Sequence, residues 1–521
     1  MGQANRACRV PHCDGPGYRV WRLLLHGLFR QRDRRDAQDQ EVYQLLEVSD
    51  GQLYSGKPGQ DAMTSATTTI IQFGSVTFSK DTIKSAVLLE EHDPISATLP
   101  IGTLTLTLYS DDTGFVLINP VGDYLMFQSG QPLVVYETIG SSSVLIGQFY
   151  VDVWENVSQS LNKLVCVDLL GILDKLEYNG GMWLNAVSLD VLLSTVLDGA
   201  GMAYELDPEL DGKQVKGWIP ICTYREALQQ IAFAVGASVT CARQGGFIKI
   251  SKAQLVGTVF TGGLCGVPSC GQSRIRARAW RPNAWVSNSD SGYLDTGVLC
   301  GISSCGQSRI LAKKFRRGAW RLEVPEIYVP SSEKVSSGQS LLLKPQVTGV
   351  NVKSHDWVEG IESINLYEGV LSAGTHKIVF SKPSYNLSIT GATIGDFGAN
   401  YAWVTVATDG IVSLTGFQYT DTSKNFGVYM LGGYQKENVL LVPDAFLVSS
   451  SEGEETAQRV YDYYQQRYIQ KSSLIVPVAA VGNLVSIDTF YSQHIRGVVE
   501  RLETDLSLGF VASVSIVGKV G

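Results

Sequence analysis

The 521-residue sequence has no long hydrophobic run and few cysteines or histidines, and each shortage excludes a class of protein. Arg22 and His26 interrupt the apolar residues 20–29, and Pro477 interrupts residues 474–482, so neither run reaches the roughly 20 residues of a membrane span. Nine cysteines are too few for a disulfide scaffold, and the six histidines are scattered singly. We therefore expect no membrane insertion and no histidine metal centre.

Catalytic motifs are also missing. The sequence has no G-x-S-x-G, H-E-x-x-H, P-loop or G-x-G-x-x-G motif. The acidic groups Glu90 with Glu91, Asp111 with Asp112, and residues 452–455 lie in turn-like or pre-helical sequence, where solvation or the helix dipole explains them. We expect no enzyme, no catalytic residue and no cofactor.

The residues that are present indicate a mainly β chain with a few helices. Fifty-three glycines, seventeen prolines and many short Thr/Val/Ile/Leu runs are typical of strands and turns. The length predicts roughly three to four domains. Because 42 Lys and Arg stand against 50 Asp and Glu, the net charge of −8 argues against a surface that binds nucleic acid throughout.

Residues 1–62 differ from the rest, because arginines crowd a stretch with little periodicity. One interpretation is a basic arm that touches nucleic acid or a partner. The other is a disordered extension, or upstream sequence that precedes a true start at Met63. We prefer the second, since strand-like sequence begins just after Met63.

Residues 63–179 predict a first β-domain, and residues 180–254 predict an α+β domain. TLTLTLY at residues 103–109 alternates as a half-buried strand should, and Cys166, Leu169, Leu170 and Leu173 share one helical stripe. In the second segment Ser188 caps a helix that Gly199 ends, and Thr223 with Glu226 forms a capping box. SVTCARQGGFIKI then predicts a hairpin that turns at residues 244–246.

Residues 255–322 contain a repeat, because LCGVPSCGQSRI recurs 35 positions later as LCGISSCGQSRI. Two copies predict a duplicated β-unit. Three roles are open for its cysteines: a tetrahedral zinc site, a disulfide, or packing as small apolar residues, which we prefer. The four cysteines are Cys265, Cys270, Cys300 and Cys305.

The same repeat is basic and aromatic, which makes it a candidate interaction surface. Arginine with tryptophan can stack on nucleic acid or an acidic glycan. The same residues can instead cover the outer face of the β-unit or dock on a neighbouring subunit, and we prefer this interpretation. The residues are Arg274, Arg276, Arg278, Trp280, Arg281, Trp285, Arg316, Arg317 and Trp320.

The remaining sequence returns to strands. Residues 349–438 predict a β-sandwich-like insertion, with strands such as LSITGATIG and YAWVTVATDG. One helix is expected over residues 454–469, followed by alternating strands up to FVASVSIV. Residues 323–348 together with residues 439–521 are assigned to one domain that the insertion interrupts.

Three blocks of the sequence resemble the baseplate hub and tail-associated hub proteins of bacteriophage and prophage tails. The first block runs from PVGDYLMFQ through VLIGQFYVDVW to VCVDLLGILDKLEY, and the second is CTYREALQQIAFAVGASV with RQGGFIKI. The third is EETAQRVYDYYQQRY with VGNLVSIDT and RGVVERLETDLSLGFVASVSIVG. Together they cover about half of the chain in the family's order.

This resemblance implies a homotrimer in which two β-barrel-like hub domains per subunit, residues 63–179 and residues 323–348 plus 439–521, alternate in a pseudo-sixfold ring. Such a ring adapts a hexameric tail to a threefold spike or fibre and surrounds the DNA channel. The implied partners are the distal tail or tube protein, the tape measure, and the spike or fibre. The implied location is the virion tail tip after synthesis in the bacterial cytoplasm.

The Cys/Arg/Trp repeat and the Arg-rich N-terminus depart from the family pattern, and no lysozyme or peptidase segment is recognisable. Two other functions remain as alternatives to the hub. One is a receptor-binding adhesin that recognises a surface glycan, and the other is a tail-associated cell-wall hydrolase whose site is assembled from distant residues.

Overall fold

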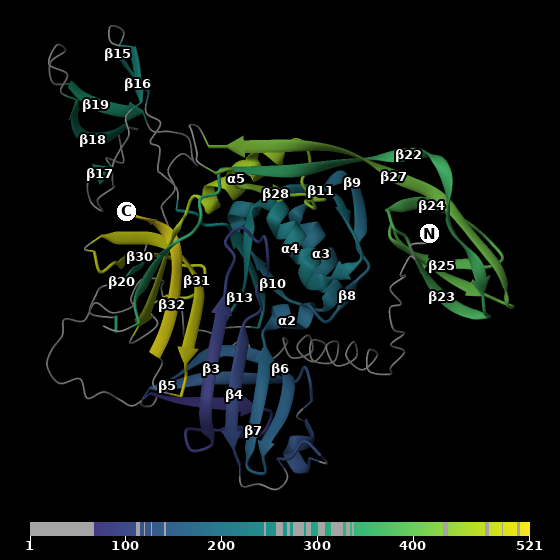
Figure 1. Ribbon diagram of the computed structural model, residues 1–521, viewed down its shortest axis with the longest axis horizontal. Coiled ribbons are helices and arrows are strands. Elements are labelled where there is room, and N and C mark those ends of the chain that lie inside the picture. Colours follow the sequence, from purple (N-terminus) through teal and green to yellow (C-terminus); the bar gives the residue numbers. More distant parts are fainter. Residues whose placement is uncertain are drawn as a thin grey trace, which may run out of the picture.

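The computed structural model is built mainly of β-strands, with a cluster of helices at its centre (Figure 1). It describes residues 67–520 except for 111–114, 119, 127, 140–141, 244–245, most of 257–333, 336–337, 431–435, 475–478, 492 and 508–510. The prediction of a multidomain, mainly β chain with few helices is confirmed. The Arg-rich residues 1–62 lie outside the described residues.

The first β-module contains antiparallel strands in the order β2-β1-β5-β6-β7-β4-β3. In β4 the predicted alternation buries Leu104, Leu106 and Leu108 completely, while the threonines remain half-buried. These leucines pack around Phe115 in the core of the module. The strands are β1 (Thr67–Phe73), β2 (Val76–Phe78), β3 (Ile83–Glu91), β4 (Thr103–Tyr109), β5 (Pro132–Ile139), β6 (Ser142–Ser158) and β7 (Leu161–Val167).

The second β-module is assembled from two distant parts of the chain. Its strands are β20 (Ile327–Val329), β21 (Ser340–Leu343), β29 (Tyr468–Leu474), β30 (Leu484–Asp488), β31 (His494–Asp505) and β32 (Val511–Val520). They follow the order β21-β29-β32-β31-β30-β20. Strand β3 of the first module pairs with β31, so both modules belong to one 13-stranded sheet. The described strands close into no barrel.

A central α/β unit lies between the two modules in the sequence. It contains α2 (Leu169–Leu173), β8 (Glu177–Tyr178), β9 (Gly181–Ser188), α3 (Leu189–Ala200), β10 (Tyr204–Leu206), η2 (Pro208–Leu210), β11 (Gln214–Ile219), β12 (Cys222–Thr223), α4 (Tyr224–Val235), β13 (Ala237–Cys241) and β14 (Ile248–Lys252). The hairpin β13–β14 and the helix caps are confirmed: Ser188 accepts from Val191 N, and Thr223 and Glu226 form the capping box.

Two local predictions in this region are wrong. Helix α3 does not end at Gly199 but continues to Ala200, because Gly201, at φ 71°, is the residue in the left-handed region. Cys166 does not belong to a helical stripe, since it lies in β7. Asp168 caps the short helix α2 by accepting from Gly171 N, so the helix begins only at Leu169.

An arm projects from the centre, towards the right in Figure 1. Its long hairpin consists of β22 (Gly349–Leu371) and β27 (Gly410–Tyr429), and its tip adds β23 (Gly374–Val379), β24 (Ser384–Thr390), β25 (Thr393–Phe397) and β26 (Tyr401–Val406). The sheets β24-β27-β22-β28, in which β28 is Val439–Val442, and β23-β26-β25 share a small core that includes Val404 and Leu414. The arm occupies the segment predicted as a sandwich-like insertion.

The chain returns from the arm through β28 (Val439–Val442) and α5 (Gly453–Tyr464). Helix α5 is shorter than the predicted residues 454–469, because Tyr468 and Ile469 already pair with β32. Its buried residues Ala457 and Val460 belong to the central core together with Ile95, from the loop after β3, and Val350, from the base of the arm. This core therefore fixes the arm and the first module to the central unit.

Candidate assembly interface

The joint between the two β-modules is an antiparallel strand pair. Strand β3 meets the second half of β31, with Leu88 opposite Thr504, Leu89 opposite Glu503 and Glu91 opposite Arg501. The pairing extends beyond the strand ends, since His92 N donates to Glu500 O at 2.8 Å and Leu506 N donates to Ala86 O at 2.8 Å. An internal interface is thus made by main-chain hydrogen bonds along strand edges.

Ion pairs flank this joint. Arg501 Nη1 lies 2.9 Å from Glu91 Oε1 across the pair, and Arg243 Nε, from the turn after β13, donates to Glu90 Oε1 at 2.8 Å. Glu90 and Glu91 are therefore strand residues with partners, and our prediction that they are solvated turn residues is wrong. Periodicity over two residues could not reveal arginines placed 153 and 410 positions away.

A buried polar group lies behind the joint. His92 is 6% exposed, and burial lowers the pKa of its imidazole to about 4. Burial also raises the pKa values of Glu500 and Asp93. Tyr463 Oη donates to Glu500 Oε1 at 2.8 Å, and Lys344 Nζ lies 3.8 Å from Glu500 Oε2. Titratable groups of both modules are therefore buried or partly buried beside the joint.

The two modules share one strand plan. The strands of the first module run in the order β3-β4-β7-β6-β5, and those of the second run in the order β21-β29-β32-β31-β30. The two orders are the same when β3 to β7 are matched, in chain order, with β21, β29, β30, β31 and β32. Each plan continues with one earlier strand, β1 or β20, which pairs antiparallel in the first module and parallel in the second. The modules are related as two copies of one fold.

Irregular features repeat as well, at equivalent residues. A bulge separates Val151 from Val153 in β6, and a bulge separates Val499 from Arg501 in β31. In each module the carbonyl of the valine that precedes the bulge accepts from a glycine N–H. Gly130 donates to Val151 at 2.5 Å, and Gly482 donates to Val499 at 2.8 Å. The two glycines have φ values of 80° and 81°. Since bulges are positional features rather than defects, Val151 and Val499 are equivalent residues.

The plan leaves two strand edges open. β31 pairs with β30 through its first half and with β3 through its second half, whereas β6 pairs with β5 only up to Tyr150. Among the described strands, β7 alone flanks β6 from Val153 to Ser158. Likewise β21, the counterpart of β3, has β29 as its one partner among the strands that the structure describes. The open edge of β21 corresponds to the edge of β3 that pairs in the joint, and the open edge of β6 corresponds to the edge of β31 that pairs there.

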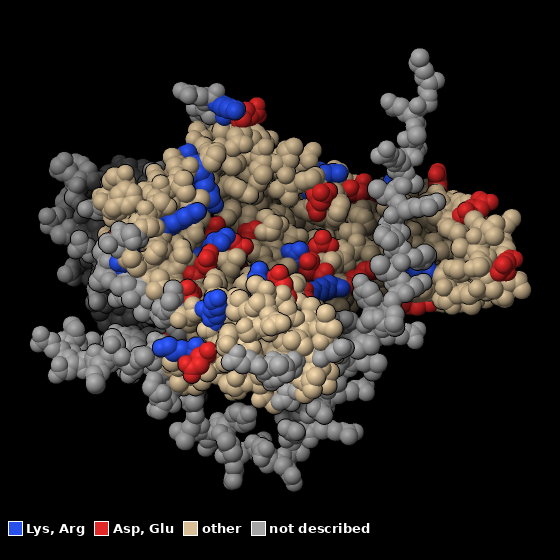
Figure 2. All heavy atoms as spheres, turned by 60° about the horizontal axis from the view of Figure 1, so that its bottom comes forward, with Lys and Arg blue, Asp and Glu red and all other residues tan. Residues whose placement is uncertain are grey.

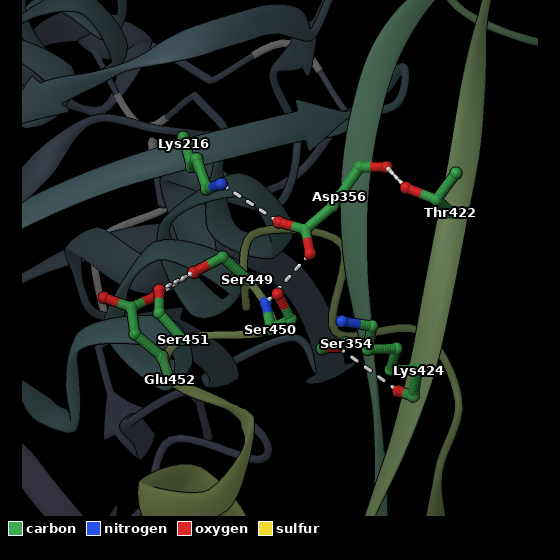
Figure 3. Close-up of polar contacts among 9 residues, drawn as sticks. All are labelled: Lys216, Ser354, Asp356, Thr422, Lys424, Ser449, Ser450, Ser451 and Glu452. Atoms are coloured by element: carbon green, nitrogen blue, oxygen red, sulfur yellow. Dashed lines mark hydrogen bonds and ion pairs between the residues drawn. The ribbon is translucent and has the colours of Figure 1, made fainter.

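The arm is anchored to the centre by a second polar group (Figure 3). Lys216 Nζ of β11 lies 2.9 Å from Asp356 Oδ1 of β22, and Asp356 Oδ2 accepts from Ser450 N at 3.4 Å. The neighbouring residue of β22, His355, is 2% exposed and contacts Asp421 Oδ2 of β27 at 2.8 Å through Nδ1. These bonds fix the direction in which the arm leaves the centre.

The duplicated segment forms hairpins with matching registers. Copy one pairs β15 (Leu264–Val267) with β16 (Gly271–Arg274), so that Leu264 faces Arg274. Copy two pairs β18 (Tyr293–Cys300) with β19 (Ser308–Lys313), so that Leu299 faces Arg309, the same register 35 positions later. A short strand, β17 (Val286–Ser287), joins β18.

The structure does not test the predicted site residues of this segment. The backbone of Cys265, Arg274 and Cys300 lies in these strands, but their side chains are outside the description. Wholly outside the described residues are Cys270, Arg276, Arg278, Trp280, Arg281, Trp285, Cys305, Arg316, Arg317 and Trp320.

The described part of the chain contains no group of three or more His, Cys, Asp or Glu side chains arranged to hold a metal ion. None of its helices is long and apolar enough to cross a membrane.

The chain is similar in structure to prophage tail proteins, at low sequence identity. The 43 kDa tail protein of prophage MuSo2 from Shewanella oneidensis is 10% identical with a TM-score of 0.42, covering 87% of this chain and 98% of that one. A tail protein from Neisseria meningitidis MC58 is 8% identical with a TM-score of 0.46, covering 87% and 97%. Prophage tail protein gp18 from Listeria monocytogenes EGD-e is 6% identical with a TM-score of 0.42, covering 87% and 94%. No protein-family model and no curated protein matches the chain.

Proposed function

We propose that the chain is a structural component of a phage or prophage tail tip, a baseplate hub that assembles into a ring. The observation that carries this proposal is the duplicated strand order, with one joint filled inside the chain and the equivalent edges of β21 and of the second half of β6 open among the described strands. A joint between non-identical edges is heterologous, so its repetition from copy to copy generates a closed ring when the rotation permits.

The number of copies in this proposal comes from the sequence resemblance to tail hubs. Three copies with two equivalent modules each make six similar positions in the ring. A pseudo-sixfold ring of this kind matches a hexameric tail on one side and a threefold spike or fibre on the other. The proposed partners are therefore a second and third copy, the distal tail or tube protein, the tape measure, and the spike or fibre.

Charge supports a ring that lets DNA pass rather than one that holds it. The chain carries a net charge of −8, so its overall field repels phosphates. On one face of the molecule, acidic and basic side chains are intermixed in the hollow centre, without a patch of one sign (Figure 2). The function we propose rests on binding and geometry, with no catalytic step.

The test is the solution mass of the full chain by light scattering, followed by negative-stain images of the same sample. The expected result is a particle of three times the 56.7 kDa chain mass, with a threefold outline and a central hole. A chain that remains monomeric at concentrations up to 100 μM would contradict the proposal.

A further inference from the structure

We infer that the open edge of β21 in one copy pairs with β6 of the next copy, at residues 153–157, in the register of the β3–β31 joint. This inference rests on the proposed ring and specifies its contact between subunits. The occupant of each open edge is thus a second copy of this chain.

The register follows from residues that the shared plan makes equivalent. Leu88 faces Leu104 in the first module, and Leu341 faces Gln470 in the second. Leu104 in turn faces Cys166, and Gln470 faces Ile516. Cys166 and Ile516 are both completely buried, and they face the equivalent valines Val151 and Val499. Traced through these facing pairs from the equivalent valines, Leu341 is therefore the equivalent of Leu88.

The facing pairs of the new joint can then be written from those of the known one. Leu88 opposite Thr504 becomes Leu341 opposite Asn156, and Leu89 opposite Glu503 becomes Leu342 opposite Glu155. The second pair repeats the same residue types. Lys344 N donates to Arg467 O at 2.7 Å, so alternation turns the N–H and C=O groups of Leu341 and Leu343 away from β29. These groups are available to a strand on the open side.

Exposure distinguishes the open joint from the filled one. In the filled joint Leu89 and Glu90, the counterparts of Leu342 and Leu343, are both partly buried. At the open edge Leu342 and Leu343 are 50% and 55% exposed, and across the proposed contact Val153 and Val157 are 50% and 54% exposed. Apolar residues on unpaired strand edges are a liability that proteins normally avoid, and pairing with another copy removes it.

The charged residues of the four strand edges indicate which edge pairs with which. In the filled joint the acidic end of β3 meets Arg501, through Glu91. In the open joint Lys344 follows β21, while β6 carries Asp152 and Glu155. If β3 met β6 of another copy in this register, Glu91 would face Val153 and lose its pairing with Arg501, and if β21 met β31, Lys344 would face Arg501. Like charges across a strand pair are unfavourable, so the two modules alternate around the ring.

Cysteine pairs test this contact in the full chain. Leu342 and Glu155 fall on a pair without direct hydrogen bonds, where opposed Cα atoms are about 4.5 Å apart, within the range for a disulfide. Under mild oxidation the variant L342C/E155C is expected to give covalent dimers and trimers that a reducing agent dissociates. The single variants L342C and E155C control for the native cysteines.

Two matched variants test the register and provide a reference for the crosslinking yield. L89C/E503C repeats the same pair in the filled joint and is expected to crosslink within one chain, without a change in mass. L342C/V153C places the cysteines diagonally, roughly 7–8 Å apart, and is expected to crosslink at least fivefold less than L342C/E155C.

The outcomes separate this inference from the proposed ring. A trimer by light scattering in which L342C/E155C gives no crosslink, while L89C/E503C does, overturns the strand contact and leaves the ring intact. A trimer that crosslinks through L342C/V153C instead overturns the register. A chain that stays monomeric overturns both.

Discussion

His92 packs against Gly482 across the joint between the two modules. A Cβ atom on Gly482 would lie 3.3 Å from Nε2 of His92, and the glycine has a φ of 81°. The left-handed backbone favours glycine here, and a Cβ atom would in addition press against the His92 ring.

Gly482→Ala is therefore expected to lower the free energy of unfolding by about 1–2 kcal/mol from backbone strain alone, and by more once His92 has to move. Gly130→Ala is the matched control, since Gly130 has an equivalent φ of 80° beside the open edge. Thermal unfolding of both variants checks this. An equal loss for the two would remove any role for the His92 contact.

Acid is expected to weaken the joint through His92. Its pKa falls from 6.5 to about 4 on folding, so the unfolded chain binds more protons between these values and stability rises with pH in this window. The stability that is lost on going from pH 6.5 to pH 4 amounts to about 3 kcal/mol for this group at most. Glu500 and Asp93, whose pKa values are raised, act in the opposite direction above their usual titration range.

His92→Gln isolates the contribution of the imidazole, because both carboxyl groups remain in the variant. Denaturant unfolding of the wild type and the variant between pH 4 and pH 7 is the measurement. We expect the wild type to gain stability relative to the variant as the pH rises. A difference that does not vary with pH would contradict the assignment.

The capping box of α4 offers a test of local stability. Thr223 Oγ1 accepts from Glu226 N at 3.1 Å, and Thr223 N donates to Glu226 Oε2 at 2.9 Å. Thr223→Ala removes the first bond and is expected to cost about 1 kcal/mol, whereas Thr223→Ser keeps it and should cost less than about 0.5 kcal/mol. Chemical denaturation monitored by circular dichroism ranks the two variants, and the reverse order would contradict the cap.

The anchor of the arm should act locally. Burial tends to raise the pKa of Asp356, but the hydrogen bonds from Ser450 and Lys216 outweigh it and the pKa is lowered. Lys216→Met is expected to change the global stability by less than about 1 kcal/mol, because the pair is partly exposed. The amide of Ser450 should exchange hydrogen several times faster in the variant. Unchanged exchange there would show that Lys216 does not hold the anchor.

Charges placed on the open edge of β6 should prevent assembly without unfolding the chain. V153D/V157D puts two carboxylates on residues that are 50% and 54% exposed, so the fold is expected to tolerate them. The apparent dissociation constant of the trimer should rise at least tenfold. Val191→Asp, on helix α3 at 53% exposure, is the control and should assemble normally. Normal assembly of the double variant would exclude this edge from the contact.

The sequence predicts elements whose signal is local. The alternation of Leu104, Leu106 and Leu108, the cap at Thr223 and the hairpin β13–β14 all depend on neighbours within a few residues. The error at Cys166 has the same origin, because a chance spacing resembled a helical stripe. Asp168 followed by two leucines was the cap signal that would have corrected it.

The strand plan shared by the modules could not be predicted in this way. The equivalent residues were identified from a bulge, a glycine φ and the pairing of β21 with β29. In the sequence β21 precedes the arm and β29 follows it. Few residue types are shared at the equivalent positions, although Leu88 with Leu341, and Glu503 with Glu155, are among them. Contacts over such distances leave no periodic pattern in the sequence.

Because β3 and β31 are far apart in the sequence, the ribosome makes β3 well before its partner strand. Glu91 and Arg501 are 410 residues apart, so a ribosome that adds about 5–20 residues per second completes β31 roughly 20–80 s after β3. During this interval the first module can fold, but the edge of β3 has no internal partner and is open to mispairing with another nascent chain. Subunits can therefore join correctly only after translation of the second module.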